Sequence, residues 1–297
     1  MKQEYKSFAF RPKTIVLITT MNAIVSNYQK QGFVLTVRQL YYQLVSQNIV
    51  PNTEKSYKLV TSVVNDARLA GLMDWDGIED RTRSFVRRNR WNSPADILRA
   101  VSKQYHEDLW VGQEARPFVI VEKEALAGVL ERVCNTYDVP LLAARGYPSG
   151  TVLREFAETD IIPVIERGQN VAIIHLGDHD PSGIDMTRDL TNRFEMFSAA
   201  VDLGAFNLQR IALTMGQIQA QKPPPNPAKS TDARFASYRS KFGSDSWELD
   251  ALKPAFLVSL VEAEIKLHIT NASRWKAAHD KIEAEKKKLV AVADKWK

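Results

Sequence analysis

Residues 170–186 read NVAIIHLGDHDPSGIDM: an apolar run, a glycine, two aspartates one residue apart, and a Pro-x-Gly turn. A short apolar run that is bounded by turn residues and followed by a helical pattern predicts a buried strand of a parallel sheet. PFVIV from residue 117 and VPLLAA from residue 139 repeat this pattern, and NLQRIALT from residue 207 predicts a fourth strand. Helices are predicted in TVLREFAETDIIPVIERG from residue 151 and, on either side of Pro254, in WELDALKPAFLVSLVEAEIKLHI from residue 247. The second part of the chain is therefore expected to be an α/β domain with a parallel sheet.

The residues before this domain carry helical patterns. Three helices are predicted there, over residues 11–31, 36–47 and 54–71. Thr36 and Gln39 have the spacing of a capping box at the start of the second helix. Three short helices followed by a small β element, here expected in LMDWDGIED from residue 72, are typical of a winged-helix module. A further helix opens at Ser93 and Pro94, and we expect it to link the two domains.

Composition narrows the class of protein. The chain has 297 residues, a net charge of +5 and a single cysteine, Cys134, so no disulfide can form within it. The N-terminus carries no recognisable secretory signal, and no apolar stretch approaches the ~20 residues that span a bilayer. We therefore expect a cytoplasmic protein with no membrane partner. The positive net charge favours a polyanionic partner.

A basic segment, RTRSFVRRNRW at residues 81–91, is the candidate contact for that partner. Arginine binds phosphate in a bidentate manner, and the aromatic residues of the segment can stack on bases. A solvated charged strip is the alternative interpretation. The candidate nucleic-acid-binding residues are Arg81, Arg83, Arg87, Arg88 and Arg90. The Pro-rich loop at residues 221–234 is either a surface linker or a second nucleic-acid contact.

Three acidic residues follow the predicted strands. Glu122 closes the run that begins at residue 117, and Asp178 and Asp180 follow the run that ends at Leu176. Functional groups of open α/β sheets gather beyond the carboxyl ends of the strands, and residues i and i+2 of an extended segment point to the same side. If the two strands are neighbours, the three carboxylates share one pocket. They then need a proton or a divalent cation, and hard oxygen ligands favour Mg²⁺, with Mn²⁺ as the second choice.

Four short motifs carry a resemblance to a known family. They are RQLYY at residues 38–42, VEKEA at 121–125, RGYP at 145–148 and DHDPSG at 178–183. A glutamate that closes one strand and an Asp-x-Asp that closes a later one are similar to the Toprim domain of topoisomerases, primases and some nucleases. The four motifs in this order resemble the A subunit of topoisomerase VI and its meiotic double-strand-break relatives. That resemblance implies an α/β protein with a winged-helix-like module followed by a Toprim domain, which has a Rossmann-like parallel sheet.

The resemblance also implies roles for individual residues. Tyr42 aligns with the nucleophilic tyrosine and Arg38 with its companion, while Glu122, Asp178 and Asp180 align with the Mg²⁺ ligands. Helical spacing agrees in part, because it places Tyr41 on the apolar face of its helix and Tyr42 on the polar flank, one turn after Arg38. Gln39 departs from the family, which has an acidic residue at this position. The family further implies a homodimer in which one protomer's tyrosine meets the other's metal site, and a separate ATPase subunit.

Two enzymatic hypotheses and one non-enzymatic hypothesis follow. The first is Mg²⁺-dependent DNA cleavage through a tyrosyl-phosphate link at Tyr42; the second is a Toprim nuclease that uses metal-activated water on DNA or RNA. The third is a nucleic-acid-binding or scaffold protein that has the fold without enzymatic activity. The expected organisation is a winged-helix-like domain at residues 1–92, a linking helix at 93–116, a Toprim-like metal-binding domain at 117–270 and a basic helix at 271–297.

Overall fold

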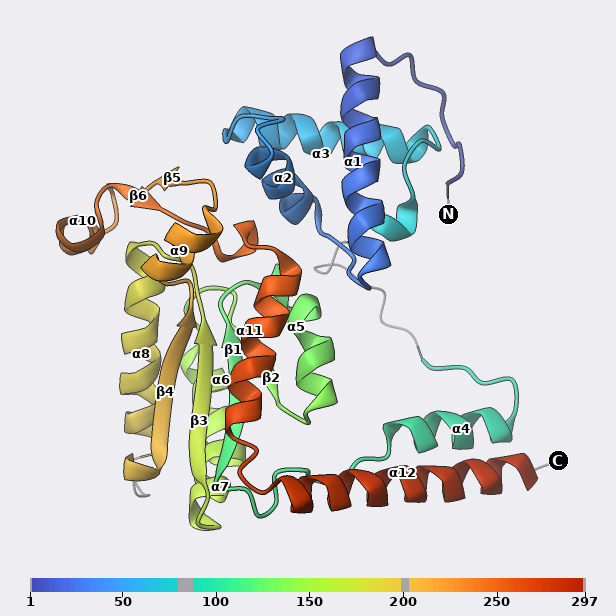
Figure 1. The fold of residues 1–297 in the computed structure, drawn as a ribbon, viewed down its shortest axis with the longest axis vertical. Coiled ribbons are helices and arrows are strands. Elements are labelled where there is room, and N and C mark those ends of the chain that lie inside the picture. The colour runs from blue at the N-terminus through green and yellow to red at the C-terminus, as the bar shows by residue number, and fades with distance from the viewer. Residues whose placement is uncertain (1, 80–87, 199–202, 296–297) are drawn as a thin grey trace.

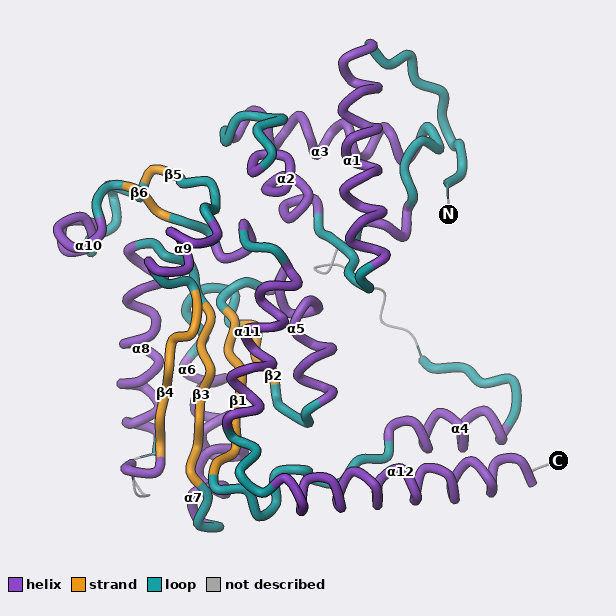
Figure 2. The backbone as a smooth tube through the Cα atoms, viewed as in Figure 1, coloured by secondary structure: helices purple, strands orange, loops and turns teal. Residues whose placement is uncertain are grey.

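The computed structural model describes residues 2–79, 88–198 and 203–295 and has an α/β fold (Figures 1 and 2). Within these residues, a parallel sheet packs between helices, a helical N-terminal unit lies beyond one end of the sheet, and two helices form an arm at the other end. No helix of this described part combines the length and the apolar character needed to cross a bilayer.

The sheet contains the strands that the sequence predicts. The described strands of this sheet are β1 (Ala115–Val121), β2 (Leu141–Ala143), β3 (Asn170–Leu176) and β4 (Phe206–Ala212). All are parallel, in the order β2-β1-β3-β4. Because the chain adds β2 on one side of β1 and β3 on the other, the order reverses between β1 and β3. In such sheets the crevice beyond the carboxyl ends of these two strands is the usual ligand site.

Helices cover both faces of the sheet. One face packs on α5 (Glu124–Thr136) and α11 (Pro254–Leu267), and the other on α6 (Gly150–Phe156), α7 (Ile162–Glu166) and α8 (Pro181–Phe197). Alternation along β1 decides this division, because Val119 and Val121 point into the first core whereas Phe118 and Ile120 point into the second. A π-helical turn (Ala157–Ile161) joins α6 to α7 within the predicted helical segment.

The N-terminal unit has a core of its own. It contains α1 (Pro12–Lys30), α2 (Val37–Ser46) and α3 (Glu54–Leu69), as the sequence predicts. The predicted capping box at Thr36 and Gln39 is present in both directions. After α3, residues 72–79 hold a 3₁₀ turn (Trp75–Gly77) and an isolated bridge between Leu35 and Ile78, so these described residues show no strand pair that would form a wing.

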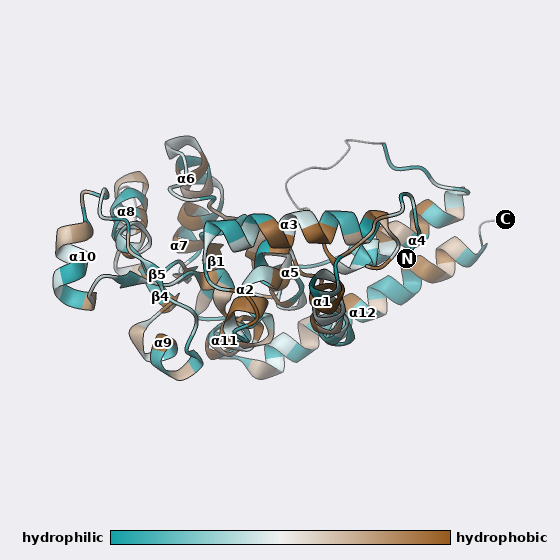
Figure 3. Cartoon of the chain, turned by 90° about the horizontal axis from the view of Figure 1, so that it is seen from above, coloured by the Kyte–Doolittle hydropathy of each residue, from teal (hydrophilic) through white to brown (hydrophobic). Residues whose placement is uncertain are grey.

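The predicted linking helix pairs with the C-terminal helix. The elements of this arm are α4 (Pro94–Gln104) and α12 (Ala272–Lys295), which lie side by side (Figure 1). Ser93 caps α4 through the backbone nitrogen of Asp96, as expected. An ion pair of 3.0 Å between Arg99 and Asp294 joins the two helices. Seen from above, both show hydrophilic and hydrophobic segments in turn, as amphipathic helices do (Figure 3).

The segment between β4 and α11 differs most from the sequence prediction. Its elements are α9 (Met215–Gln221), β5 (Asn226–Pro227), α10 (Phe235–Phe242), β6 (Asp245–Ser246) and the 3₁₀ turn η4 (Leu249–Ala251). A separate 3₁₀ turn, η3 (Leu203–Ala205), precedes β4. Helix was predicted on both sides of Pro254, but only the residues from Pro254 onward form one. Proline is favoured at the first helical position because it needs no hydrogen-bond acceptor there. The residues before it, which include the turn η4, carry two acidic side chains to the end of the sheet.

Candidate active site

A cleft of about 850 Å³ lies at the carboxyl end of β1 and β3, against the N-terminal unit. Its lining combines side chains of α2, of α3 and the residues before it, of the loops after β1 and β3, of the start of α8, and of β5, β6 and the residues after each. They are Arg38, Tyr41, Tyr42, Asn52, Thr53, Glu54, Tyr57, Glu122, Lys123, Asp178, Asp180, Ser182, Asn226, Pro227, Lys229, Ser246 and Glu248. The predicted tyrosine, arginine and three carboxylates therefore line a single cleft within one chain. The homodimer that the resemblance implies stays a prediction.

Glu122 connects the ends of the two central strands. Its backbone nitrogen donates to Leu176, which extends the β1–β3 pairing by one residue. Its Oε2 accepts a hydrogen bond of 2.9 Å from the backbone nitrogen of Asp178. Burial and the nearby charge of Asp178 raise the pKa of Glu122 to about 7, because both disfavour the ionised carboxylate. Glu122 can therefore gain or lose a proton at neutral pH.

Asp178 is held on both of its carboxylate oxygens. Oδ1 accepts from the backbone nitrogen of Leu249 at 2.7 Å, and Oδ2 lies 3.0 Å from the ammonium nitrogen of Lys123. The residue is 7% exposed. Burial raises the pKa of Asp178, and Lys123 opposes that rise by stabilising the charged form. Lys123 thus supplies the positive charge that pairs with the Asp178 carboxylate.

Asp180 caps the helix that follows the loop. Its Oδ1 accepts from Ser182 Oγ at 3.0 Å and from the backbone nitrogen of Gly183 at 2.6 Å, and Pro181 occupies the first position of α8. A Cβ on Gly183 would collide with the carbonyl oxygen of Asp178. The Asp-x-Asp-Pro-x-Gly motif therefore has a structural explanation: a cap, a helix start and a close approach of two backbones.

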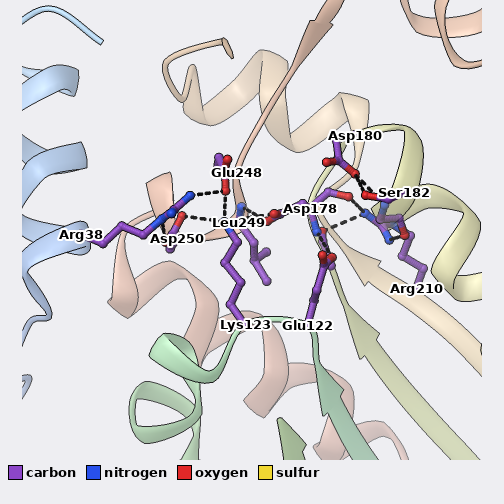
Figure 4. Close-up of polar contacts among 12 residues, drawn as sticks. Arg38, Glu122, Lys123, Asp178, Asp180, Ser182, Arg210, Glu248, Leu249 and Asp250 are labelled. Atoms are coloured by element: carbon purple, nitrogen blue, oxygen red, sulfur yellow. Dashed lines mark hydrogen bonds and ion pairs between the residues drawn. The ribbon is translucent and has the colours of Figure 1, made fainter. Parts of the chain in front are cut away.

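Two acidic residues that the sequence analysis missed complete the cluster. Glu248 and Asp250 flank Leu249, and both contact the ammonium of Lys123, with Asp250 Oδ1 at 3.1 Å (Figure 4). Asp250 has no exposed surface. The signal in the sequence was a second acidic pair at i and i+2, in WELD at residues 247–250. The prediction of a helix over these residues hid it, because i and i+2 face different directions on a helix.

Arg38 binds the same two acidic residues from the N-terminal unit. Its Nη2 lies 2.7 Å from Glu248 Oε2, and its Nε lies 2.8 Å from Asp250 Oδ2. Burial would lower the pKa of Arg38, but the nearby groups together, with Asp250 the largest contributor among them, outweigh burial and raise that pKa. Arg38 thus stays charged and joins α2 to the turn at η4.

Tyr42 is more buried than its helical position suggested. Its side chain was expected on a polar flank of α2, but it is 5% exposed and belongs to the hydrophobic core of the N-terminal unit, beside Tyr41. The guanidinium carbon of Arg38 lies 5.6 Å from the centre of its ring. Burial raises the pKa of Tyr42, and Asp250 raises it further while Arg38 lowers it. Tyr42 is therefore a neutral phenol at neutral pH.

Arg210 of β4 holds the acidic loop from below. Its Nη2 donates to the carbonyl oxygens of Gly177 and Asp178 at 2.8 and 2.6 Å, and its Nη1 donates to that of Gly183 at 2.8 Å. Figure 4 shows it on the side of the loop opposite to Lys123. No signal in the sequence identified this residue, because the role depends on the neighbouring position of β4 in the sheet.

The basic segment gives less information. Arg81, Arg83 and Arg87 lie outside the described residues, and Arg88 and Arg90 are exposed. In the Pro-rich loop, Asn226 and Lys229 line the cleft, and the amide of Asn52 donates to Pro225 O and to Asn226 Oδ1 at 2.9 and 2.7 Å. This loop therefore contacts the N-terminal unit and forms part of the cleft wall.

The three predicted ligands have the chemistry that a hard divalent cation needs, but they are not assembled around one. Within residues 2–79, 88–198 and 203–295, no three Asp, Glu, His or Cys side chains are arranged to hold a metal ion. Both oxygens of Asp178 and one oxygen each of Glu122 and Asp180 already accept protein hydrogen bonds or ion pairs. The carboxylates of Glu122, Asp178 and Asp180 could hold Mg²⁺ only if Asp178 gave up its ion pair with Lys123 and bound the ion instead.

Searches of protein-family models and of curated proteins return no match to this chain. Support for a function therefore comes from the side chains of the cleft.

Proposed function

We propose that the chain cleaves the DNA backbone in a Mg²⁺-dependent reaction, as a Toprim protein resembling the topoisomerase VI A subunit. The observation that carries this proposal is that Tyr42, Arg38 and the carboxylates of Glu122, Asp178 and Asp180 line one cleft. A nucleophile, a cation for phosphate and an acidic set of this kind are the parts that a phosphoryl transfer needs. In this proposal the N-terminal unit is a winged-helix variant that positions the duplex through its phosphates.

Each side chain has a defined role in the tyrosine reaction. The phenolic oxygen of Tyr42 attacks phosphorus, the bond from phosphorus to one sugar oxygen breaks, the phenolic proton passes to a base, and the sugar oxygen takes up a proton. Arg38 stabilises the charge that develops on the phosphate oxygens. Mg²⁺ held by Glu122, Asp178 and Asp180 would offset negative charge on the phosphate.

A hydrolytic reaction is the second candidate, and two observations favour it. Tyr42 is buried and its pKa is raised, which makes the phenol a weak nucleophile. Gln39, where the family has an acidic residue, is 1% exposed and serves the capping box of α2. In this alternative an activated water attacks DNA or RNA, and Tyr42 only shapes the cleft. A homodimer and a separate ATPase subunit remain predictions of the resemblance.

Plasmid cleavage distinguishes the two reactions. Supercoiled plasmid is incubated with the protein and Mg²⁺, with and without protease before electrophoresis. The tyrosine reaction gives protein-linked ends that enter the gel only after protease, and Tyr42→Phe abolishes them. The hydrolytic reaction gives free ends that Tyr42→Phe retains. Asp178→Asn should abolish either reaction, and full activity in that variant or no cleavage by the wild-type protein contradicts the proposal.

A further inference from the structure

The ammonium of Lys123 occupies the centre of the acidic cluster. It lies 3.0 Å from Asp178 Oδ2 and 3.1 Å from Asp250 Oδ1, and it contacts Glu248. Its side chain is 16% exposed, and that of Asp250 is fully buried. Lys123 follows Glu122 directly, so its backbone position is fixed by the end of β1. A cation therefore already stands beside the carboxylates that the proposed Mg²⁺ would need.

Charge balance explains why a cation is required here. Five acidic side chains surround the end of the sheet, namely Glu122, Asp178, Asp180, Glu248 and Asp250, and the cations that contact them or their loop are Arg38, Lys123 and Arg210. Buried carboxylates without a counter-charge repel one another and take up protons. Lys123 is the one of these cations that contacts the Asp178 carboxylate.

We infer that Lys123 is a resident counter-ion that a divalent cation must displace from Asp178. When no divalent ion is bound, Lys123 keeps Asp178 charged and holds it in place, so the acidic loop keeps its form. When a divalent ion binds, Asp178 transfers from the ammonium to the ion. Lys123 then stays on Glu248 and Asp250, beside Arg38. This inference depends on the proposed divalent-ion site and adds a positioning role for Lys123.

The side chains on the far side of Lys123 make this exchange feasible. Glu248 and Asp250 also bind Arg38, so they remain neutralised whether or not Lys123 contacts Asp178. Asp178 keeps its second hydrogen bond, from the backbone nitrogen of Leu249. The exchange therefore breaks a single ion pair and leaves no buried charge without a partner.

Direct measurement of Mg²⁺ binding tests the inference. Isothermal titration calorimetry at pH 8 is applied to the wild-type protein, to Lys123→Met and to Lys123→Arg. An opposite charge in contact with a carboxylate changes its affinity for a proton by about 1–3 pK units, so removal of the competing ammonium in Lys123→Met should tighten Mg²⁺ binding by about tenfold or more. Arginine holds a carboxylate in a bidentate manner, so Lys123→Arg should weaken Mg²⁺ binding relative to the wild-type protein.

Lys229→Met is the matched control. Lys229 is an exposed lysine of the same cleft, and it is not a partner of Asp178 in the described structure. Because its charge is screened by solvent, its loss should change the Mg²⁺ affinity by less than about twofold. Thermal unfolding gives a second readout, since Lys123→Met should unfold at a lower temperature than the wild-type protein without metal and gain more stability from added Mg²⁺.

The outcomes separate this inference from the proposed function. If the wild-type protein binds Mg²⁺ and Lys123→Met binds it no more tightly, the displacement role is wrong while the metal site stands. If Lys123→Met does not fold, the comparison of Lys123→Arg with the wild-type protein decides, and equal or tighter binding by Lys123→Arg overturns the inference. If none of the proteins binds Mg²⁺, both the metal site and the role of Lys123 are overturned.

Discussion

The carboxylate of Glu122 at the end of β1 accepts a hydrogen bond from the backbone nitrogen of Asp178 at the end of β3, at 2.9 Å. This bond joins the two strand ends at which the order of the sheet reverses. It also places the Glu122 carboxyl where burial and Asp178 raise its pKa to about 7. Two pH effects of opposite sign follow from that single carboxyl.

The first effect concerns metal binding. A divalent ion must displace the proton of Glu122, so the affinity for Mg²⁺ should rise with pH below the pKa of about 7, by up to about tenfold per pH unit, and level off above it. Calorimetric titrations between pH 6 and 8.5 measure this slope. In Glu122→Gln, which cannot ionise, the slope around pH 7 should disappear. An unchanged slope in that variant would show that another group supplies the proton.

The second effect concerns the stability of the metal-free protein. The folded pKa of Glu122 lies above its usual value, so the folded state binds the proton more tightly than the unfolded state. The resulting stability is fully present below about pH 4.5 and is lost as pH rises through about 7. Urea unfolding of Glu122→Gln should lack this contribution, so the difference in free energy of unfolding between wild type and variant should change between pH 5 and pH 8. A constant difference would contradict the raised pKa.

Gly183 should not tolerate a side chain. A Cβ there would collide with the carbonyl oxygen of Asp178, so Gly183→Ala should lower the free energy of unfolding by about 1–3 kcal/mol and weaken Mg²⁺ binding. Gly216 in α9 is a matched control, because nothing lies within 4 Å of a Cβ added at that position. Gly216→Ala should be neutral or stabilising by up to about 1 kcal/mol. Equal effects of the two substitutions in urea unfolding would refute the close approach.

Arg210 should determine the order of the acidic loop. Arg210→Met removes the hydrogen bonds to the carbonyl oxygens of Gly177, Asp178 and Gly183 and should cost about 2–3 kcal/mol. Hydrogen exchange measured by mass spectrometry should then speed up in peptides that contain residues 177–183. Arg188→Met is the control, since solvent screens the exposed pair of Arg188 with Asp185 and its loss should leave exchange in residues 177–183 unchanged. If hydrogen exchange in residues 177–183 were unchanged in Arg210→Met, Arg210 would not be what orders the acidic loop.

Arg38 and Asp250 should be energetically coupled. Their ion pair of 2.8 Å joins α2 to η4, and Asp250 has no exposed surface. Arg38→Met leaves that carboxylate with Lys123 as its remaining cation and should cost about 1–3 kcal/mol. A double-mutant cycle with Asp250→Asn should give a coupling energy of at least about 1 kcal/mol. Additive effects would show that the pair does not stabilise the contact between the two units.

Local patterns explain how far the sequence predicts this fold. Apolar runs identify the strands, and the pair Thr36 and Gln39 identifies the start of α2, because both signals depend on neighbouring residues alone. The convergence of Glu122 with Asp178 also followed from the sequence, since parallel strands that lie next to each other end at the same edge. The winged-helix module stays a prediction, since the described residues 72–79 hold a 3₁₀ turn (Trp75–Gly77) capped by Asp74 and no strand pair.

The parts of the site that were missed depend on contacts between distant segments. Tyr42 lies off the apolar face of α2 taken alone, yet it is buried in a hydrophobic core that also includes Ala251 of the distant turn η4. The sequence indicated Lys123 only as a member of the VEKEA motif and not as an ion-pair partner, because Glu248 and Asp250 follow it by more than 120 residues. No periodicity within one helix or strand could report these relationships.

The cap at the start of α8 affects how mutations of the acidic motif must be interpreted. Asp180→Ala removes a negative charge and also leaves the backbone nitrogen of Gly183 without its acceptor, so lost activity in this variant would have two causes. Asp180→Asn keeps an oxygen that can serve the helix terminus while it removes the charge. Comparison of these two substitutions assigns the loss either to chemistry at the cleft or to fraying of the helix.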